Sequence, residues 1–500
     1  MLEGVRLDTK HSSMNIGKNQ YLIGTTGVVL DQDVTCSIKI HFCNYMVFMG
    51  EGCLYTTVQS NHRSALLLGY IVDAENELNN TDELLKEFLS AIHTDSANVS
   101  DCVKFWGGRW CLFYEVEGKI NVITDTCGLK QVFFYVQNQV LTLASQARYI
   151  ADLYSLKEND SAKAHISKAM MMDKEYSWPA DATLYDDVKR LLPNHILTEK
   201  EGKAKRYNTS GYRVENPILK MADLLKSQMR GLQKIKPCAL TITAGLDSRL
   251  VLAAADKKDE KYKAVTLQYN GVNDRHVDLT VPAEICKEVG VKHDIIRCVP
   301  IDVSFKERYN AHGENAHSYW SQMAYAVEIN GYDSYVWVKG SCNEVLRNSC
   351  GVLDSWQITP NILCKLFKIP YDDFSEMVLS KWLQDAKSYC KINDMRLLDL
   401  FYWEHRCGSW LSECLNESDL VSETFTPFNC RAYLELGLMF NEARRMPPNY
   451  TLFAEIIEKC GLRVKVPVNA GRYSSLKSKV KILLKNRLHL LYGLIITFHK

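Results

Sequence analysis

The pattern of apolar and polar positions divides the chain into a strand-rich first part and a second part in which strands and helices alternate. In the first part, short apolar runs recur between polar or glycine-containing breaks, which is typical of β-strands. One segment differs, because the apolar residues of 79–92 recur at helical spacing and predict an amphipathic helix with Thr81 as its N-cap. We expect strands at 20–24, 28–30, 37–42, 45–49, 105–115, 121–135 and 141–145.

From residue 216 onwards, apolar runs alternate with helical patterns. Strands are predicted at 238–243, 264–269, 295–299 and 336–340, helices at 218–233 and 277–289, and mostly helical structure from 360 to 470. Strands that alternate with helices favour a parallel, doubly wound sheet. The predicted fold class is therefore α/β. The predicted domains are a β-rich domain 1–155, a connecting segment 156–215, a second domain 216–470 and a tail 471–500.

Composition narrows the classes of function. With 500 residues, 46% apolar and 24% charged, the chain has the composition of a globular protein of two or three domains. A net charge of +1 provides no overall field toward nucleic acid, so we expect no nucleic-acid partner. The 17 cysteines form no C-x-x-C pair and no zinc-type spacing, and no signal or membrane-spanning pattern is present. These features indicate free thiols and a cytoplasmic location.

The most informative stretch is 238–255, which predicts a buried strand, a tight loop and a helix. Its loop reads Thr243-Ala244-Gly245-Leu246-Asp247-Ser248. Such a loop places backbone N–H groups and a helix N-terminus around one point, which suits a phosphate or pyrophosphate group. Asp247 is suited to Mg²⁺, and the hydroxyls of Thr243 and Ser248 to phosphate oxygens. The alternative interpretation is an ordinary strand–helix turn capped by Asp247 and Ser248.

This loop resembles the PP-loop S-G-G-x-D-S of the asparagine synthetase family and other ATP pyrophosphatases. It departs from that motif by Thr243 and by Ala244, which is tolerable only at a negative φ. Further stretches in the family's order are 105–115, 121–135, 141–145, 182–195, 336–347 and 426–429. The resemblance spans about 105–469. It implies a degenerate, glutaminase-like Ntn-hydrolase sandwich followed by an ATP-pyrophosphatase domain with a helical C-terminal part.

The resemblance also implies the site residues. It assigns ATP binding to Thr243, Ala244, Gly245, Leu246, Asp247, Ser248, Gln268 and Gly340. It assigns catalysis to Asp247, Glu344 and Arg347, and Mg²⁺ to Asp247 and Glu344. Asn343 stands where the family has a neighbouring acid, and the family's lysine tract is absent. The catalytic lysine therefore stays unassigned.

The implied chemistry is adenylation of a carboxylate by ATP, followed by attack of an amine to form an amide. The family's glutaminase nucleophile is an N-terminal cysteine, but position 2 is Leu2 and the first cysteine is Cys36. An internal cysteine cannot replace that group, so we expect no glutamine hydrolysis. Cys36 and Cys43 are predicted to be buried small hydrophobic residues.

The implied partners are a small-molecule or saccharide carboxylate and a separately supplied amine donor. The tract 401–410 resembles that of synthetase-like proteins found with surface-sugar enzymes, which suggests surface polysaccharide or natural-product biosynthesis. The alternative is a catalytically inactive nucleotide-binding scaffold, favoured by Ala244, Asn343 and the missing lysine tract. The sequence does not indicate an oligomeric state.

The tail 471–500 carries seven Lys or Arg and no acid, with apolar residues at helical spacing. This pattern predicts a basic amphipathic helix. It would lie on an anionic surface, such as the inner face of a membrane, or pack on the preceding domain.

Overall fold

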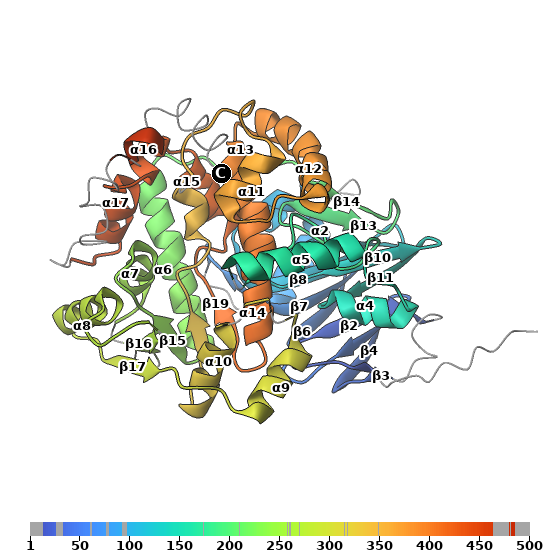
Figure 1. The fold of residues 1–500 in the computed structure, drawn as a ribbon, viewed down its shortest axis with the longest axis horizontal. Coiled ribbons are helices and arrows are strands. Elements are labelled where there is room, and N and C mark those ends of the chain that lie inside the picture. The colour runs from blue at the N-terminus through green and yellow to red at the C-terminus, as the bar shows by residue number, and fades with distance from the viewer. Residues whose placement is uncertain are drawn as a thin grey trace, which may run out of the picture.

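Two six-stranded antiparallel sheets form the first part of the molecule (Figure 1). One has the order β12–β10–β11–β2–β5–β4 and the other β14–β13–β9–β8–β7–β6. The first sheet comprises β2 (Tyr21–Thr25), β4 (Ile38–Phe42), β5 (Tyr45–Met49), β10 (Phe133–Gln137), β11 (Val140–Ala144) and β12 (Lys189–Arg190). The second comprises β6 (Tyr55–Ser60), β7 (Arg63–Asp73), β8 (Trp106–Val116), β9 (Lys119–Thr124), β13 (His195–Thr198) and β14 (Lys203–Arg206).

The computed structural model describes most of the chain, and the following account is confined to that part. The described residues are 14–26, 34–60, 63–76, 80–92, 98–173, 175–209, 211–257, 259, 262–269, 271–314, 316–317, 319–348, 350–463, 480 and 482–485.

The two sheets pack face to face as a sandwich. Their inner faces share one apolar core, in which Tyr21 and Val47 of the first sheet lie in the same cluster as Leu66 and Phe113 of the second. The outer faces are covered by helices: α2 (Thr81–Ala91) and α3 (Val99–Cys102) on one side, α4 (Ala147–Tyr154) on the other. Alternation of inward and outward residues along the strands produces this arrangement.

Several details of the first part differ from the expectation. The predicted strand 121–135 is two strands, because residues 125–132 turn between β9 and β10 with Gly128 at φ +66°. Helix α2 is capped by Asn80, whose side chain accepts from the Glu83 N–H, and not by Thr81. Cys43 is exposed and Cys36 partly buried, so the prediction that both are buried is wrong. The predicted strand 28–30 lies outside the described residues.

The segment 156–215 is not only a connection. It contributes β12 to one sheet of the sandwich and β13 and β14 to the other. The sandwich thus extends beyond residue 155 in sequence. Helix α5 (Asp160–Asp173) of the same segment packs beside the later α12 (Asp373–Ile392), where His165 meets the Asp372 carboxylate.

The second part contains a five-stranded parallel sheet of order β17–β16–β15–β18–β19. Its strands are β15 (Cys238–Thr241), β16 (Tyr262–Gln268), β17 (His293–Arg297), β18 (Val336–Val338) and β19 (Thr424–Phe425). Helices α6 (Pro217–Ile235), α7 (Leu246–Ala254) and α8 (Val277–Val289) share a core with one face. Helices α9 (Val303–His312) and α10 (Trp320–Ile329) share a core with the other. The α/β class with a doubly wound parallel sheet is confirmed.

The rest of the second part is helical, as predicted, except for the short strand β19. It contains the 3₁₀ turn η1 (Asn343–Leu346), α11 (Pro360–Phe367), α12, α13 (Leu397–Phe401), the π-helix η2 (Tyr402–Leu411), α14 (Ser412–Ser418), α15 (Arg431–Leu438), α16 (Glu442–Arg445) and α17 (Thr451–Lys459). Most of the basic tail 471–500 lies outside the described residues. In the described part, no helix is both long and apolar enough to cross a membrane.

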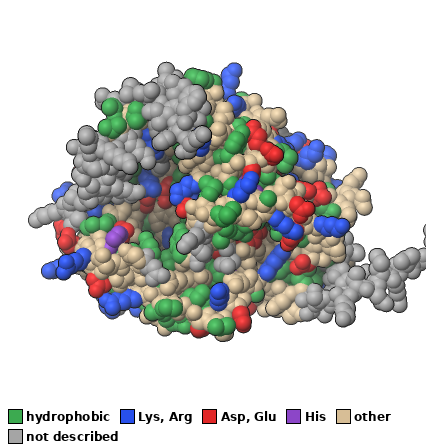
Figure 2. All heavy atoms as spheres, viewed as in Figure 1, with side chains coloured by type: hydrophobic (Ala, Val, Ile, Leu, Met, Phe, Trp, Pro, Cys, Tyr) green, Lys and Arg blue, Asp and Glu red, His purple; other side chains and the backbone are tan. Residues whose placement is uncertain are grey.

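Buried polar contacts join the two parts. Arg109 of β8 forms an ion pair of 2.5 Å with Asp419, both almost fully buried. Asn429 donates to the Gly108 carbonyl at 2.7 Å and to the Asp125 carboxylate at 2.9 Å. On the outer surface, Figure 2 shows acidic, basic and apolar side chains interspersed on the visible face, in keeping with the net charge of +1.

Candidate functional site

The candidate site lies at the carboxyl end of the parallel sheet, between β15 and β18. The chain builds the sheet outward from β15 through β16 to β17 and then returns to place β18 on the other side of β15. The loops after β15 and β18 therefore diverge at a switch in strand order, which is where open α/β sheets bind ligands. The loop 243–248 follows β15, and the stretch 339–342 follows β18.

Hydroxyl groups hold the loop after β15 in shape. The Thr243 N–H donates to Ser248 Oγ at 3.1 Å, and the two hydroxyl oxygens lie 3.3 Å apart. The Gly245 N–H donates to Thr243 Oγ1 at 3.2 Å. Ala244 does not have a positive φ, so its side chain is tolerated, and its N–H donates to Asp278 at 3.0 Å. Thr243 and Ser248 thus stabilise the loop itself, and Thr243 also lines the adjacent cavity.

The loop ends at the N-terminus of α7, which no side chain caps. Gly245 is the N-cap residue, and Leu246 is buried at the first helical position. Asp247 stands in the first turn rather than at the cap position expected from the sequence. Because the first N–H groups of a helix lack intrahelical acceptors, this end attracts an anion. The second loop comes very close here: a Cβ on Gly340 would lie 2.8 Å from the Asp247 Cβ and 3.0 Å from the Ser248 nitrogen.

Asp247 is bound by two side chains from the segment after β18. Asn343 donates to Asp247 Oδ1 at 2.7 Å, and Arg347 lies 2.8 Å from Oδ2. Arg347 also lies 3.6 Å from Glu344, so one guanidinium bridges two carboxylates. Tyr433 donates to the Asn343 amide oxygen at 2.9 Å and fixes its orientation. The structure thus brings Asp247, Glu344 and Arg347 together, as the sequence analysis expects.

Among these residues, burial has the largest effect on the pKa of Glu344. It raises the pKa of Glu344 to about 7; Arg347 lowers that pKa and Asp247 raises it. Asp247 and Glu344 compete for one cation, Arg347. A change of charge at this point, such as the arrival of a phosphate group, would be coupled to the proton on Glu344.

The same contacts bear on the assignment of Mg²⁺. Both carboxylate oxygens of Asp247 already have partners, and the nearest acid, Glu344, faces the same guanidinium. Mg²⁺ demands near-octahedral oxygen ligands, which this arrangement does not offer while Arg347 occupies it. The described geometry does not fit a Mg²⁺ ion resident on Asp247 and Glu344.

A cavity of about 410 Å³ opens next to the loop, on the side toward α10. Residues from the ends of β15, β16, β18 and β19 and from α10 form most of its wall, with Tyr319 and Trp320 beside them. The exposed surface of the wall is mainly apolar, with several hydroxyl groups, one carboxylate and one amine among the lining side chains, which is typical of pockets for small organic ligands. Its lining includes Thr241, Ile242, Thr243, Val265, Thr266, Leu267, Tyr269, Asp278, Tyr319, Trp320, Met323, Trp337, Lys339, Ser418 and Thr424.

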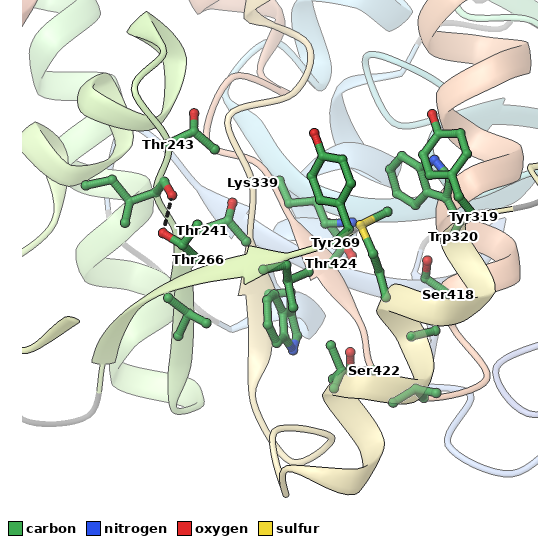
Figure 3. Close-up of a pocket in the computed structure, with 18 of the residues that line it drawn as sticks. Thr241, Thr243, Thr266, Tyr269, Tyr319, Trp320, Lys339, Ser418, Ser422 and Thr424 are labelled. Atoms are coloured by element: carbon green, nitrogen blue, oxygen red, sulfur yellow. Dashed lines mark hydrogen bonds between the residues drawn. The ribbon is translucent and has the colours of Figure 1, made fainter. Parts of the chain in front are cut away.

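Lys339 is the cation of this cavity. Figure 3 shows it between Thr241 and Thr243 on one side and Tyr319 and Trp320 on the other. Its Nζ lies 4.6 Å from the centroid of the Trp320 ring. Burial lowers the pKa of Lys339 to about 8, because the charged amine loses hydration in the pocket. The amine therefore titrates near neutral pH, which is typical of functional sites.

Sequence reasoning missed Lys339. The resemblance to the asparagine synthetase family places the catalytic lysine in a tract near 446–452, and that stretch contains no lysine. A usable signal was present, since Lys339 directly follows the buried strand Val336-Trp337-Val338 and precedes Gly340. A lysine at the carboxyl end of a parallel strand, next to a close-approach glycine, is a candidate site residue on position alone.

Gln268, which the sequence analysis assigns to ATP binding, is not part of the cavity wall. The Gln268 side chain donates to the Val272 carbonyl at 3.0 Å and to Asp274 at 2.9 Å. It lines a shallow hollow of about 280 Å³ with Arg297, and this hollow shares Tyr269 and Val272 with the cavity. The structure therefore places Gln268 beside the cavity, with its side-chain amide bound to Val272 and Asp274.

Comparison with known proteins finds similar solved structures but does not assign the chain to a family. No protein-family model and no curated protein matches the chain. Solved structures that match include glutamine phosphoribosylpyrophosphate amidotransferase from B. subtilis complexed with ADP and GMP, at 10% identity, 58% of this chain, 64% of that chain and a TM-score of 0.23. The chain thus spans less than two thirds of that enzyme's length.

Two NAD synthetases also match. The NH3-dependent enzyme from Campylobacter jejuni matches at 18% identity over 27% of this chain and 60% of its own, with a TM-score of 0.18. The glutamine-dependent enzyme from Acinetobacter baumannii, in complex with ADP, matches at 12% sequence identity with a TM-score of 0.19. The match covers 57% of this chain and 77% of that enzyme. TM-scores of this size do not establish a shared fold, so the site is interpreted from its own geometry.

Proposed function

We propose that this chain is an ATP-dependent, AMP-forming amide ligase of the asparagine synthetase type, without glutaminase activity of its own. The observation that carries the proposal is the uncapped N-terminus of α7. It lies at the switch point of a parallel sheet, beside an apolar cavity of about 410 Å³. An anion-binding helix end next to a pocket for a small organic ligand suits a nucleoside triphosphate.

The reaction would proceed in two steps. A carboxylate oxygen attacks the α-phosphorus of ATP, the bond from that phosphorus to the bridging oxygen breaks, and pyrophosphate leaves. An amine then attacks the carbonyl carbon of the acyl-adenylate, AMP leaves, and the amine loses a proton. The loop N–H groups and the α7 N-terminus would stabilise the charge that develops on pyrophosphate.

Two cations have distinct roles in this proposal. Arg347, which already pairs with Asp247 at 2.8 Å, would turn toward the pyrophosphate when it forms. Lys339 would lie beside the nucleotide in the cavity and stabilise negative charge on it or on the carboxylate. The carboxylate substrate class is open in this proposal and includes amino acids, uronic acids and peptide carboxylates.

Pyrophosphate release from MgATP tests the proposal. The assay uses a panel of carboxylates (aspartate, uronic acids and a peptide carboxylate) with ammonia as the amine. Release that depends on one carboxylate, with AMP formed in equal amount and activity lost in Ser248→Ala and Lys339→Met, would support it. No release in the presence of every carboxylate, together with no ATP binding, would reject it.

A second candidate is a nucleotide-binding protein without catalysis. The observation that favours it is the closed group of Asp247, Asn343 and Arg347, in which each carboxylate oxygen of Asp247 already has a side-chain partner. This candidate predicts ATP binding at the same site with no pyrophosphate release. Calorimetric titration of ATP beside the release assay separates the two.

A further inference from the structure

Three cysteines that are far apart in sequence meet at one buried point. Cys127 lies in the turn between β9 and β10, Cys342 directly before η1, and Cys407 in the π-helix η2. Their sulfur atoms all lie within 4.8 Å of one another. Each side chain is at most 1% exposed. Although the chain has 17 cysteines, these are the only His, Cys, Asp or Glu residues grouped in this way within the described part.

We propose that Cys127, Cys342 and Cys407 bind one thiophilic d¹⁰ cation, Zn²⁺ or Cu⁺, as a structural site. The proposal does not rest on the proposed ligase activity. Thiolates are the ligands that select these ions, and three of them leave no role for Mg²⁺ or Ca²⁺. The site is called the three-cysteine site below.

The sulfur spacing fits a single ion. A Zn–S bond is about 2.3 Å long, so thiolates around one tetrahedral ion stand about 3.8 Å apart. The three sulfurs, all within 4.8 Å, therefore need to approach by at most about 1 Å. An iron–sulfur cube would place inorganic atoms between its ligands and spread the cysteines farther apart. A disulfide would use two of the sulfurs and leave the third beside it.

The backbone is shaped to bring the sulfurs together. Cys342 has φ +74°, in the left-handed region that disfavours residues with a side chain. Cys407 lies in a ten-residue π-helix, an uncommon form that occurs mostly at functional sites. Ordinary core packing of a small apolar residue requires neither feature. Two unfavourable backbone conformations that converge on one point indicate a ligand that compensates for them.

The position of the site indicates its role. Cys342 immediately precedes Asn343 and Glu344, which belong to the group around Asp247. Cys127 belongs to a turn of the sandwich, and Cys407 to the helical part. One ion would therefore tie the loop after β18 to two other regions of the molecule. Burial of all three side chains excludes substrate, so the site is structural.

The test is titration of the metal-free full chain with Co²⁺, which reports thiolate ligands by a charge-transfer band. Zn²⁺ and Cu⁺ are then added separately, and loss of the Co²⁺ band shows that the added ion enters the same site. We expect one Co²⁺ per chain. Affinity should be at least 100-fold weaker in Cys127→Ser, Cys342→Ser and Cys407→Ser. Cys414→Ser is the matched control, since Cys414 is also fully buried and lies on the adjacent α14. We expect it to bind Co²⁺ within twofold of the wild type.

A second measurement covers variants that fail to fold. In the wild-type chain under mildly denaturing conditions, where buried thiols become reachable, Zn²⁺ or Cu⁺ should slow the alkylation of three thiols relative to the metal-free chain. Mass spectrometry should locate these metal-protected thiols at Cys127, Cys342 and Cys407. Protection spread over other cysteines would overturn the proposal. So would the absence of a thiolate band, a band that the three substitutions leave unchanged, or an iron–sulfur spectrum with acid-labile sulfide. None of these readouts depends on ATP, so this proposal and the proposed function can fail separately.

Discussion

Two segments of this molecule each place an aspartate after a strand, and the two carboxylates are bound by different kinds of partner. Asp125 follows β9 in the sandwich, and Asp247 follows β15 in the parallel sheet. Asp125 is 1% exposed and accepts hydrogen bonds from the backbone N–H groups of Trp110, Cys127, Leu129 and Lys130 and from the Asn429 side chain. Asp247 is 13% exposed and meets two side chains, Asn343 and Arg347.

The difference separates a turn that its own backbone holds in place from a loop that side chains hold in place. Backbone donors cannot leave Asp125 without unfolding the turn, so its carboxylate organises the turn 125–130 permanently. Burial raises the pKa of Asp125, while its backbone hydrogen bonds lower it. The partners of Asp247 are side chains that can rotate away when a ligand arrives. Similar local sequence signals therefore describe one structural and one candidate functional aspartate.

The largest expected effect is on stability, in Asp125→Ala. The substitution leaves several buried N–H groups without an acceptor, at about 1–3 kcal/mol for each unsatisfied group. We expect the free energy of unfolding in urea to fall by about 3–5 kcal/mol. Asp101→Ala, which removes a half-exposed partner of Lys104, is the control and should cost less than about 0.5 kcal/mol. Equal losses in the two variants would contradict the comparison.

Asp247→Asn should show the reverse pattern. Pyrophosphate release should fall about 100-fold, because the charge that holds Arg347 at the loop is lost. Unfolding free energy should fall by less than in Asp125→Ala, because Asn keeps the shape of the side chain and Arg347 keeps Glu344 as a partner. Asp173→Asn breaks a surface pair with Lys368 and should leave both quantities unchanged. A large loss of stability without loss of release would make Asp247 a second structural aspartate.

Gly340→Ala tests the same loop by adding a methyl group in contact with Asp247 and Ser248. The added Cβ would lie 2.8–3.0 Å from atoms of Asp247 and Ser248, including backbone atoms. We expect a loss of about 2 kcal/mol in unfolding free energy and weaker ATP binding in calorimetry. Gly245→Ala is the comparison variant, because its Cβ would meet only the Thr243 hydroxyl, at 3.2 Å. If Gly340→Ala were as stable as the wild type, the loop 243–248 would be able to move aside and accommodate the added methyl group without cost.

Lys339→Met should have the smallest effect on stability, visible as a pH dependence. The pKa of Lys339 is lowered to about 8 in the folded chain, against about 10.4 when unfolded. Between these values the unfolded chain binds more protons, so wild-type stability should rise with pH across this window. The two pKa values limit this rise to about 3 kcal/mol, and it should be absent in Lys339→Met. Urea unfolding from pH 7 to 10.5 measures it, and parallel profiles would refute the lowered pKa.

The sequence by itself determined the elements whose periodicity is strong, while β6, β7, α9 and α10 had no prediction. Period-two and helical patterns depend only on neighbouring residues, so α8 was predicted at its observed bounds, Val277–Val289, and the strand–loop–helix at 238–255 was predicted as a unit. The same local logic failed where a turn residue decided the outcome. One apolar run became β9 and β10 around Gly128, and Asn80 rather than Thr81 capped α2.

Only the tertiary structure decided how the site residues are used. Asp247 meets partners almost a hundred positions away, and the pKa of Lys339 depends on burial in the cavity beside Trp320. Cys127, Cys342 and Cys407 have no motif spacing, yet their sulfurs meet. Periodicity reports which face of an element is buried. The distances between residues of different elements, and the loss of hydration that shifts a pKa, arise only when those elements pack together.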